Sequence, residues 1–201
     1  LMWGARSDVG CVRPHNEDSY LVQSPLFCVC DGMGGHAAGE VASSIAVETI
    51  AKTAPQAADA ARLAAAVEAA NAAVIEAALN GLGKPGMGCT ATCAYIENDM
   101  LAIAHVGDSR AYLLHEGTLI RVTRDHSYVE ELVDAGEITA DEARVHPNRS
   151  VITRALGSDP AMYADHFTLH IEEGDRLILC SDGLSSMIPD SDIENIATQS
   201  S

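Results

Sequence analysis

An apolar run that stops on an acidic, glycine-rich turn constrains this chain more than any other stretch. Residues 26–30 read Leu-Phe-Cys-Val-Cys, and residues 31–36 continue as Asp-Gly-Met-Gly-Gly-His. Glycines at 32, 34 and 35 let the backbone turn sharply and approach a neighbour closely, because no Cβ restricts φ or blocks contact. Residues 39–50 then place apolar side chains at helical spacing. The sequence therefore predicts a buried strand, an acidic turn and a helix in succession.

The pattern of an apolar run ending on an aspartate occurs twice more. Residues 100–106 lead into Gly107 and Asp108, and residues 176–180 lead into Ser181 and Asp182. A single aspartate after a strand is a common start of a turn, and any one of them alone would be explained that way. Three of them indicate that carboxylates converge at one edge of a sheet core.

Converging carboxylates need either protons or cations. In a partly buried place they cannot stay charged and unpaired, so their pKa values rise or they hold metal ions. Oxygen ligands, with no Cys or His at ligand spacing, favour Mg²⁺ or Mn²⁺ over Zn²⁺. Hard divalent ions are the simpler of the two explanations.

Five motifs in this chain resemble, in family order, those of the metal-dependent (PPM, type 2C) serine/threonine protein phosphatases. The residues within the motifs are most similar to those of bacterial members. The five motifs are Arg13-Pro14-His15-Asn16-Glu17-Asp18, Asp31-Gly32-Met33-Gly34-Gly35-His36, Gly88-Cys89-Thr90-Ala91, Gly107-Asp108-Ser109-Arg110 and Cys180-Ser181-Asp182-Gly183-Leu184. The resemblance implies hydrolysis of phosphoserine and phosphothreonine in proteins by a water activated between two metal ions. It also implies that the substrates are a bacterial-type Ser/Thr kinase or its phosphorylated targets.

The resemblance assigns a metal-binding role to five positions. Asp31 would bridge two core Mn²⁺ or Mg²⁺ ions, and the carbonyl of Gly32 would complete one coordination shell. Asp182 would ligate one of the two ions. Glu17 and Asp18 would act through intervening waters. Asp31 and Asp182, together with Arg13, are expected to be catalytic.

The resemblance also implies a phosphate ligand and a third ion. Arg13 matches the family's phosphate-binding arginine, and a guanidinium fork suits two phosphate oxygens at once; the alternative is a surface salt bridge. Asp108 matches a ligand of a third, weaker ion, whereas Arg110 is expected to brace its turn. Ser186 stands where many relatives place another aspartate, which leaves the third ion open.

The general acid is left open. Eukaryotic relatives carry a histidine where this chain has Met33, so that proton donor is absent. His36 is read as a cap or packing residue. His126 and His146 could contact substrate, although an ordinary surface position is preferred for both.

The segment pattern predicts a single α+β domain over residues 1–201. Helices are expected from 39–50 and within 57–80, and residues 125–149 form a polar, helical insertion read as a flap beside the active site. Short connections between the remaining strands imply antiparallel pairing. The expected strands cover residues 7–12, 19–23, 27–30, 90–96, 100–106, 110–115, 118–122, 150–155, 164–171 and 176–180. The resemblance sharpens this to a four-layer αββα sandwich.

The C-terminal end is expected to be incomplete. Family members finish with an Asp-Asn turn and a last strand that supplies another metal ligand, whereas this chain reaches Ser201 in its final helix. Either the natural chain continues, which is preferred, or the domain is weakened. The second case keeps an alternative function open, a phosphoprotein-binding or regulatory domain with poor turnover.

Composition limits the partners. Twelve Lys and Arg against 29 Asp and Glu give a net charge of −17, which argues against nucleic acid and anionic membranes. The sequence shows neither a long apolar run nor a signal peptide, so a cytoplasmic protein with reduced, buried cysteines is expected. Cys28 and Cys30 are expected on opposite faces of a strand, and Cys89 and Cys93 flank another, so neither pair is expected to clip a metal. Oligomeric state is left open.

Overall fold

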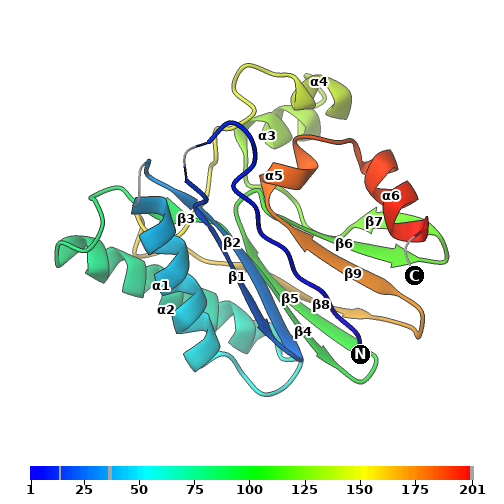
Figure 1. The fold of residues 1–201 in the computed structure, drawn as a ribbon, viewed down its shortest axis with the longest axis horizontal. Coiled ribbons are helices and arrows are strands. Elements are labelled where there is room, and N and C mark those ends of the chain that lie inside the picture. The colour runs from blue at the N-terminus through cyan, green and yellow to red at the C-terminus, as the bar shows by residue number, and fades with distance from the viewer. Residues whose placement is uncertain (14, 36–37, 200–201) are drawn as a thin grey trace.

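Two antiparallel sheets stack face to face in the computed structural model, which describes residues 1–13, 15–35 and 38–199 (Figure 1). The first sheet has the order β1-β2-β4-β5-β8, with β3 paired to β2, and the second has the order β7-β6-β9. The strands of the first sheet are β1 (Asp18–Gln23), β2 (Leu26–Met33), β3 (Gly88–Cys89), β4 (Ala91–Glu97), β5 (Met100–Val106) and β8 (Asp165–His170). Those of the second are β6 (Arg110–His115), β7 (Thr118–Arg121) and β9 (Arg176–Cys180).

Helices cover both outer faces of the sandwich. Figure 1 shows α1 and α2 side by side on the first sheet and α6 against the second. The α+β, four-layer αββα arrangement expected from the sequence is thereby confirmed. The helices are α1 (Ala38–Thr53), α2 (Ala60–Leu79), α3 (Tyr128–Asp134), α4 (Ala140–Arg144), α5 (Asp182–Ser185) and α6 (Asp190–Gln199).

The α2 helix shows how the apolar spacing becomes packing. Leu63, Val67 and Val74 lie on one face of the helix and are fully buried against the first sheet and α1. Asp59 caps the start, because its Oδ1 accepts a hydrogen bond from the Arg62 amide at 3.1 Å. The helix therefore lies within the range 57–80 predicted from the sequence, with its apolar face buried.

Two expected strands are not found among the described residues. Residues 7–12 are coil ending in a turn, and residues 150–155 contribute only one bridge, between Ile152 and Ser127. A short segment of suitable composition does not by itself supply a neighbouring strand to pair with, and pairing decides whether such a segment becomes a strand. The strand expected at residues 27–30 is longer in the structure, since β2 continues through Asp31 to Met33.

The expectation that Cys28 and Cys30 point to opposite faces is wrong, because side chains two residues apart on a strand share a face. Their Sγ atoms lie 3.7 Å apart. Cys93 stands opposite Cys28 in the register, and the two Sγ atoms approach to 2.9 Å. All three are buried free thiols, and they pack in the layer between the first sheet and α1 and α2.

None of the helices in the described part of the chain combines the length and the apolar character needed to cross a bilayer.

Candidate metal centre

Three aspartates that are far apart in the sequence meet at one end of the sandwich. Asp31 belongs to β2 of the first sheet, Asp108 follows β5 of the same sheet, and Asp182 opens α5 directly after β9 of the second sheet. Each offers a carboxylate oxygen, and these oxygens all lie within 4.8 Å of one another. They face a cavity of about 260 Å³ lined by Arg13, Glu17, Asp31, Gly32, Met33, Asp108, Ser150, Ile152 and Asp182. The predicted convergence of carboxylates is therefore what the structure shows.

Hydrogen bonds from Thr90 fix the position of Asp31 on both sides of its backbone. The Asp31 amide donates to Thr90 Oγ1 at 3.0 Å, and the Thr90 amide donates to the Asp31 carbonyl at 2.9 Å. The Thr90 and Ser109 hydroxyl oxygens are 2.5 Å apart, which links Thr90, between β3 and β4, to the residue that follows Asp108. The sequence motifs contained both hydroxyl residues, and no role was predicted for them.

A close backbone approach explains why residue 32 is glycine. A Cβ on Gly32 would lie 2.1 Å from the carbonyl oxygen of Gly39, near the start of α1, and 2.6 Å from that of Glu17. The Gly32 amide donates to the Glu17 carbonyl at 3.0 Å. Any side chain at residue 32 would push α1 away from the strand that carries Asp31.

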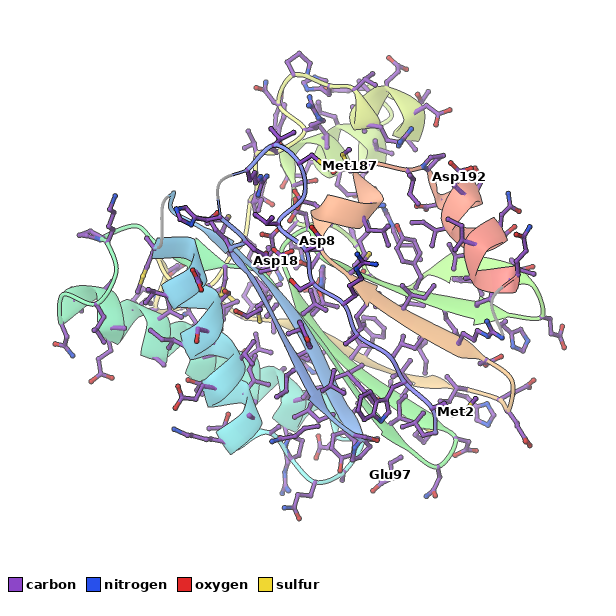
Figure 2. The ribbon with its side chains drawn as sticks, viewed as in Figure 1. Met2, Asp8, Asp18, Glu97, Met187 and Asp192 are labelled. Atoms are coloured by element: carbon purple, nitrogen blue, oxygen red, sulfur yellow. The ribbon has the colours of Figure 1, made fainter. Side chains whose placement is uncertain are left out.

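Glu17 directly precedes β1 and Asp18 is its first residue, and both lie at the same end of the sheet. Glu17 Oε1 is buried and has no hydrogen-bond partner among the described residues. Asp18 Oδ2 accepts a hydrogen bond from Ser181 Oγ at 2.9 Å. Figure 2 shows Asp18 at the end of the first sheet nearest to α5, so this bond connects the two sheets beside the aspartates.

His126 supports the turn that carries Asp108. Its Nδ1 accepts the Gly107 amide at 2.9 Å, so Nε2 carries the hydrogen and donates to Asp165 Oδ2 at 2.7 Å. Arg154 holds the other oxygen of Asp165 at 2.7 Å. Burial is the leading influence on the pKa of His126 and lowers it, in keeping with the neutral ring. The preferred surface position for His126 is therefore wrong, because the side chain is buried in a hydrogen-bond network.

Arg110 braces its turn, as expected. Its Nε and Nη2 donate to the two oxygens of Asp125 at 3.0 and 2.7 Å, and its Nη1 donates to Tyr112 Oη at 2.9 Å. Such a planar fork on a carboxylate is geometrically specific. Arg110 is therefore occupied by the protein itself and is not free to bind substrate.

Three other predicted residues take less central places. Arg13 is exposed on the rim of the cavity, and no ion pair involves it among the described residues. His146 is half-buried, and its Nδ1 accepts the Asn148 amide at 3.0 Å. His36 lies outside the described residues.

Burial and mutual proximity change the protonation of the aspartates. Burial foremost, with Asp182 and Asp18 beside it, raises the pKa of Asp31 to about 10. Burial and the nearby charge of Asp182 raise the pKa of Asp108 to about 7. No described Lys or Arg forms an ion pair with the three aspartates. The cluster therefore lacks the positive charge that would keep its carboxylates ionised at neutral pH.

The donor set fits divalent cations. Asp108 Oδ1, like Glu17 Oε1, is buried without a hydrogen-bond partner among the described residues, so both oxygens have free lone pairs at the cluster. All candidate ligands are oxygens, which suits Mg²⁺ and Mn²⁺. Ser186, which occupies the position discussed for a third ion, instead donates its hydroxyl to the Asp182 carbonyl.

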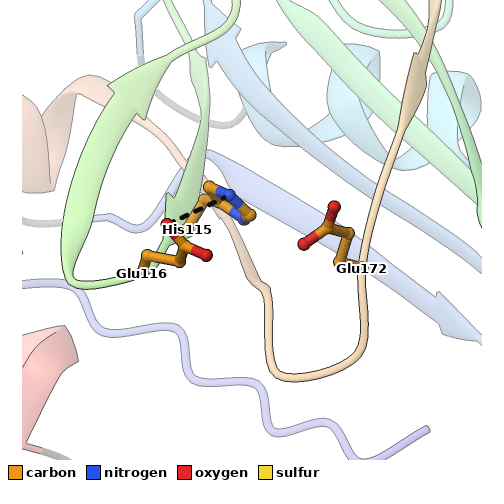
Figure 3. Close-up of side chains that lie close together, drawn as sticks. All are labelled: His115, Glu116 and Glu172. Carbon is orange, nitrogen blue, oxygen red and sulfur yellow. Dashed lines mark ion pairs between the residues drawn. The ribbon is translucent and has the colours of Figure 1, made fainter.

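A second group of His and Glu side chains lies at the loop ends of β6–β7 and β8–β9 (Figure 3). His115 Nδ1 bonds to Asp175 Oδ1 at 2.6 Å, and its Nε2 lies 3.8 Å from Glu116 Oε2. Glu172 completes the group. The imidazole already has carboxylate partners, and the group is best described as an ion-pair network that joins two loops.

Solved structures with the same architecture define the class of protein. The catalytic domain of the serine/threonine protein phosphatase PstP, solved in complex with two manganese ions, superposes with a TM-score of 0.88; it is 39% identical, and the match covers 97% of this chain and 83% of that one. An αββα sandwich with carboxylates gathered at one end is thus the fold of a metal-dependent phosphatase domain.

Sequence comparisons then identify the family. The model of the Protein phosphatase 2C family matches residues 6–201. PstP of Mycobacterium tuberculosis is 43% identical over 96% of this chain, and the serine/threonine phosphatase stp of Listeria welshimeri is 38% identical over 95%. The chain belongs to the protein phosphatase 2C (PPM) family, as the motifs indicated, and it is similar to bacterial members. It spans 38% of the length of PstP and 81% of that of stp.

Proposed function

We propose that this domain hydrolyses phosphoserine and phosphothreonine in proteins and depends on Mn²⁺ or Mg²⁺. The observation that carries the proposal is the meeting of Asp31, Asp108 and Asp182 in a cavity that has Arg13 on its rim. The two manganese ions in the related PstP domain support the choice of metal. No feature of the described residues favours the alternative, a binding domain with poor turnover.

The proposed metal ligands follow from the site. Asp31 and Asp182, with the Gly32 carbonyl, would hold two core ions, and Glu17 and Asp18 would act through water. Asp108 would hold a third, weaker ion. In such a centre divalent ions supply activation of water for in-line attack on phosphorus and stabilisation of the developing negative charge.

Arg13 would bind and orient the phosphate group of the substrate. Because no carboxylate engages it among the described residues, its guanidinium is free to donate to two phosphate oxygens. No histidine lines the described cavity. We therefore assign no histidine as general acid and propose that solvent protonates the leaving serine or threonine oxygen.

The wider context is proposed in the same way. Residues 1–201 would form one catalytic domain, with residues 125–149 as a flap that faces the substrate. Its first residues, Asp125 and His126, are anchored in the core, so α3, α4 and the loop after them form the substrate-facing part. The substrates would be a Ser/Thr protein kinase or its targets, and the domain would work in the cytoplasm, where free buried thiols such as those found here stay reduced.

The test is hydrolysis of p-nitrophenyl phosphate and a phosphothreonine peptide, with Mn²⁺ titrated against an EDTA control. We expect metal-dependent turnover of both, and we expect Asp31→Asn and Asp182→Asn each to lower kcat by roughly 100-fold or more, as loss of an essential group does. Arg13→Ala should chiefly raise KM. Asp8→Asn, an exposed carboxylate outside the cavity, is the control. Turnover that persists in EDTA, or unchanged rates in both cavity variants, would contradict the metal mechanism.

A further inference from the structure

A second hollow, of about 590 Å³, adjoins the cavity of the metal centre. The two share Arg13, Asp108, Ser150 and Asp182 in their walls. The far side of the second hollow is built from α3, α4 and the loop that leads to Ser150, with α5 and the start of α6 opposite. Figure 1 shows α3 and α4 beyond the end of the sheets at which α5 lies. A substrate bound at the metal centre would therefore extend into this hollow.

Small apolar side chains form part of the lining. Val129 and Val133 come from α3, Ala140 and Ala143 from α4, and Pro189 precedes α6. An extended peptide backbone could pack on such side chains. The room and the apolar surface fit a segment of polypeptide better than an isolated ion.

Five arginines also line the hollow, and two of them are used by the fold. Arg110 is held by Asp125, and Arg121 bonds to Glu130 at 2.5 Å. The other three, Arg13, Arg144 and Arg149, form no ion pair with any described carboxylate; Arg149 donates only to the backbone carbonyl of His146, at 3.1 Å.

The acidic residues of the same wall are largely engaged. Asp125 and Glu130 pair with arginines, and Asp190 accepts the Tyr112 hydroxyl at 2.8 Å and lies 3.6 Å from Arg110. Asp108 and Asp182 belong to the metal centre. Only Asp141, exposed on α4, lies in the lining without an ion pair or side-chain hydrogen bond among the described residues. Apart from the two aspartates of the metal centre, the hollow thus has three arginines without an ion pair against one such carboxylate among the described residues, in a chain of net charge −17.

We propose that this hollow, here named the arginine groove, binds acidic side chains that flank the phosphorylated residue of a substrate protein. Arg13 would hold the phosphate that is removed, and Arg144 and Arg149 would pair with Asp or Glu side chains of the same segment. The proposal of an acidic peptide rests on charge complementarity. Unpaired guanidinium groups beside an apolar surface select carboxylates and disfavour basic peptides. The inference deepens the proposed phosphatase function and rests on it.

The experiment compares three phosphothreonine peptides that differ only in flanking residues, which are Glu, Gln or Lys. kcat/KM is measured with Mn²⁺ for the wild-type chain, for Arg144→Gln, Arg149→Gln and the double variant, and for Arg62→Gln. Arg62 is an exposed arginine of α2 outside both hollows and serves as the matched control. p-Nitrophenyl phosphate, which has no flanking residues, reports whether the metal centre of each variant is intact.

We expect the wild-type chain to prefer the Glu peptide over the Gln peptide. Each groove substitution should reduce that preference about threefold, as expected for partly exposed ion pairs, and the double variant should nearly abolish it. Hydrolysis of p-nitrophenyl phosphate should stay within about twofold, and raising NaCl should weaken the wild-type preference because salt screens exposed charges. Arg62→Gln should behave as the wild type.

Equal rates on the Glu and Gln peptides, or a preference that survives the double substitution, would overturn the proposal. Peptide binding is followed in parallel by fluorescence anisotropy in EDTA. If the wild-type chain hydrolysed no phosphate ester, the proposed function would fail. A tighter binding of the Glu peptide that the double variant lacks would still support the arginine groove, and its absence would overturn it.

Discussion

At the residue scale, the position of Asp31 depends on how closely the backbone of its neighbour can be approached. Gly32 lies against the carbonyl groups of Gly39 and Glu17, so one missing Cβ lets β1, β2 and α1 meet beside the aspartates. The hydroxyl of Thr90 then fixes the Asp31 backbone from the other side. The proposed metal ligand Asp31 is therefore held in place by backbone groups and by the Thr90 hydroxyl.

The first prediction concerns Gly32→Ala. The added methyl group would lie 2.1 Å from a backbone oxygen, so strands and helix must separate, and we expect the free energy of unfolding to fall by about 2–3 kcal/mol. Gly4→Ala is the control, because nothing lies within 4 Å of a Cβ at residue 4. Urea denaturation of both variants checks this. Equal stability of Gly32→Ala and the wild type would mean that the close approach is not required.

The second prediction is that folding shifts the pKa values of His105 and His115 in opposite directions. Burial lowers the pKa of His105 to about 4, whereas the hydrogen bond to Asp175 raises the pKa of His115 above its usual value. The unfolded chain binds a proton at residue 105 below a pH of about 6.5, so His105 should remove about 3 kcal/mol of stability as the pH falls from about 6.5 to 4. The contribution of His115 is present at low pH and is lost as the pH rises through its raised pKa.

Histidine ring signals followed by NMR across this pH range provide the measurement. His105 should stay neutral at pH 5, with its Nε2–H bonded to the Arg124 carbonyl, while His115 is still protonated above pH 6.5. A His105 ring that became charged near pH 6.5 in the folded chain would contradict the buried, neutral assignment.

At the element scale, two helix caps of similar chemistry should have different consequences. The α2 helix, capped by Asp59, buries nine residues, including Leu63, in the core. The α4 helix, capped by Thr139 with a capping box to Glu142, buries none. Stability at the two helix ends is therefore coupled differently to the whole fold.

The third prediction follows from this contrast. Asp59→Ala should lower the global free energy of unfolding by about 1 kcal/mol, whereas Thr139→Ala should fray α4 and leave global unfolding almost unchanged. Hydrogen exchange of the α4 amides and urea denaturation separate the two effects. Because α4 carries Arg144, we also expect Thr139→Ala to weaken the preference for acidic peptides. Global destabilisation by Thr139→Ala would show that α4 is part of the core unit.

At the scale of the whole molecule, the metal centre joins the two sheets. Asp31 comes from the first sheet and Asp182 follows the second, so packing the sheets together without a cation forces Asp31 to take up a proton that the unfolded chain would not bind at neutral pH. The residues that we propose as metal ligands therefore cost stability when no cation neutralises them, as is common for functional sites.

The fourth prediction is that Mn²⁺ reverses the order of stability of the wild-type chain and the Asp31→Asn variant. Mn²⁺ at about 100 times its dissociation constant should stabilise the wild-type chain by about 3 kcal/mol. Without metal, Asp31→Asn should be more stable than the wild type by about 1–2 kcal/mol, because one carboxylate of the cluster is removed. With Mn²⁺ the order should invert. Thermal unfolding in EDTA and in Mn²⁺ measures both, and an Asp31→Asn chain stabilised by Mn²⁺ as much as the wild type would contradict the assignment of Asp31.

The sequence was a good guide to elements with a strong period and to the convergence of acids. The helix expected within residues 57–80 is present as α2, and the strands expected at 90–96, 100–106, 110–115 and 118–122 are present as the antiparallel hairpins β4–β5 and β6–β7, although β5 and β6 lie in different sheets. Asp31, Asp108 and Asp182 were expected to meet, and they do. Periodicity and strand-end positions are local properties, and a local pattern is sufficient to predict them.

Other features were missed because they depend on contacts across the chain. Residues 7–12 were expected to form a strand and are not paired, and His126, assigned to the surface, is buried by contacts with Gly107 and Asp165. The roles of Thr90 and Ser109 require the distance between their hydroxyls, which no spacing in the sequence contains. The arginine groove likewise depends on which arginines find a carboxylate.

The sequence by itself determined the family, the order of the main elements and the type of chemistry, because residue type and local period encode them. Only the tertiary structure decided which charges are neutralised. Arg110 and Arg121 form ion pairs with carboxylates, whereas Arg13, Arg144 and Arg149 form none with any carboxylate in the described part of the chain, although all five line one hollow. Whether a charge is paired depends on distances of a few ångströms between residues far apart in sequence, and folding alone sets those distances.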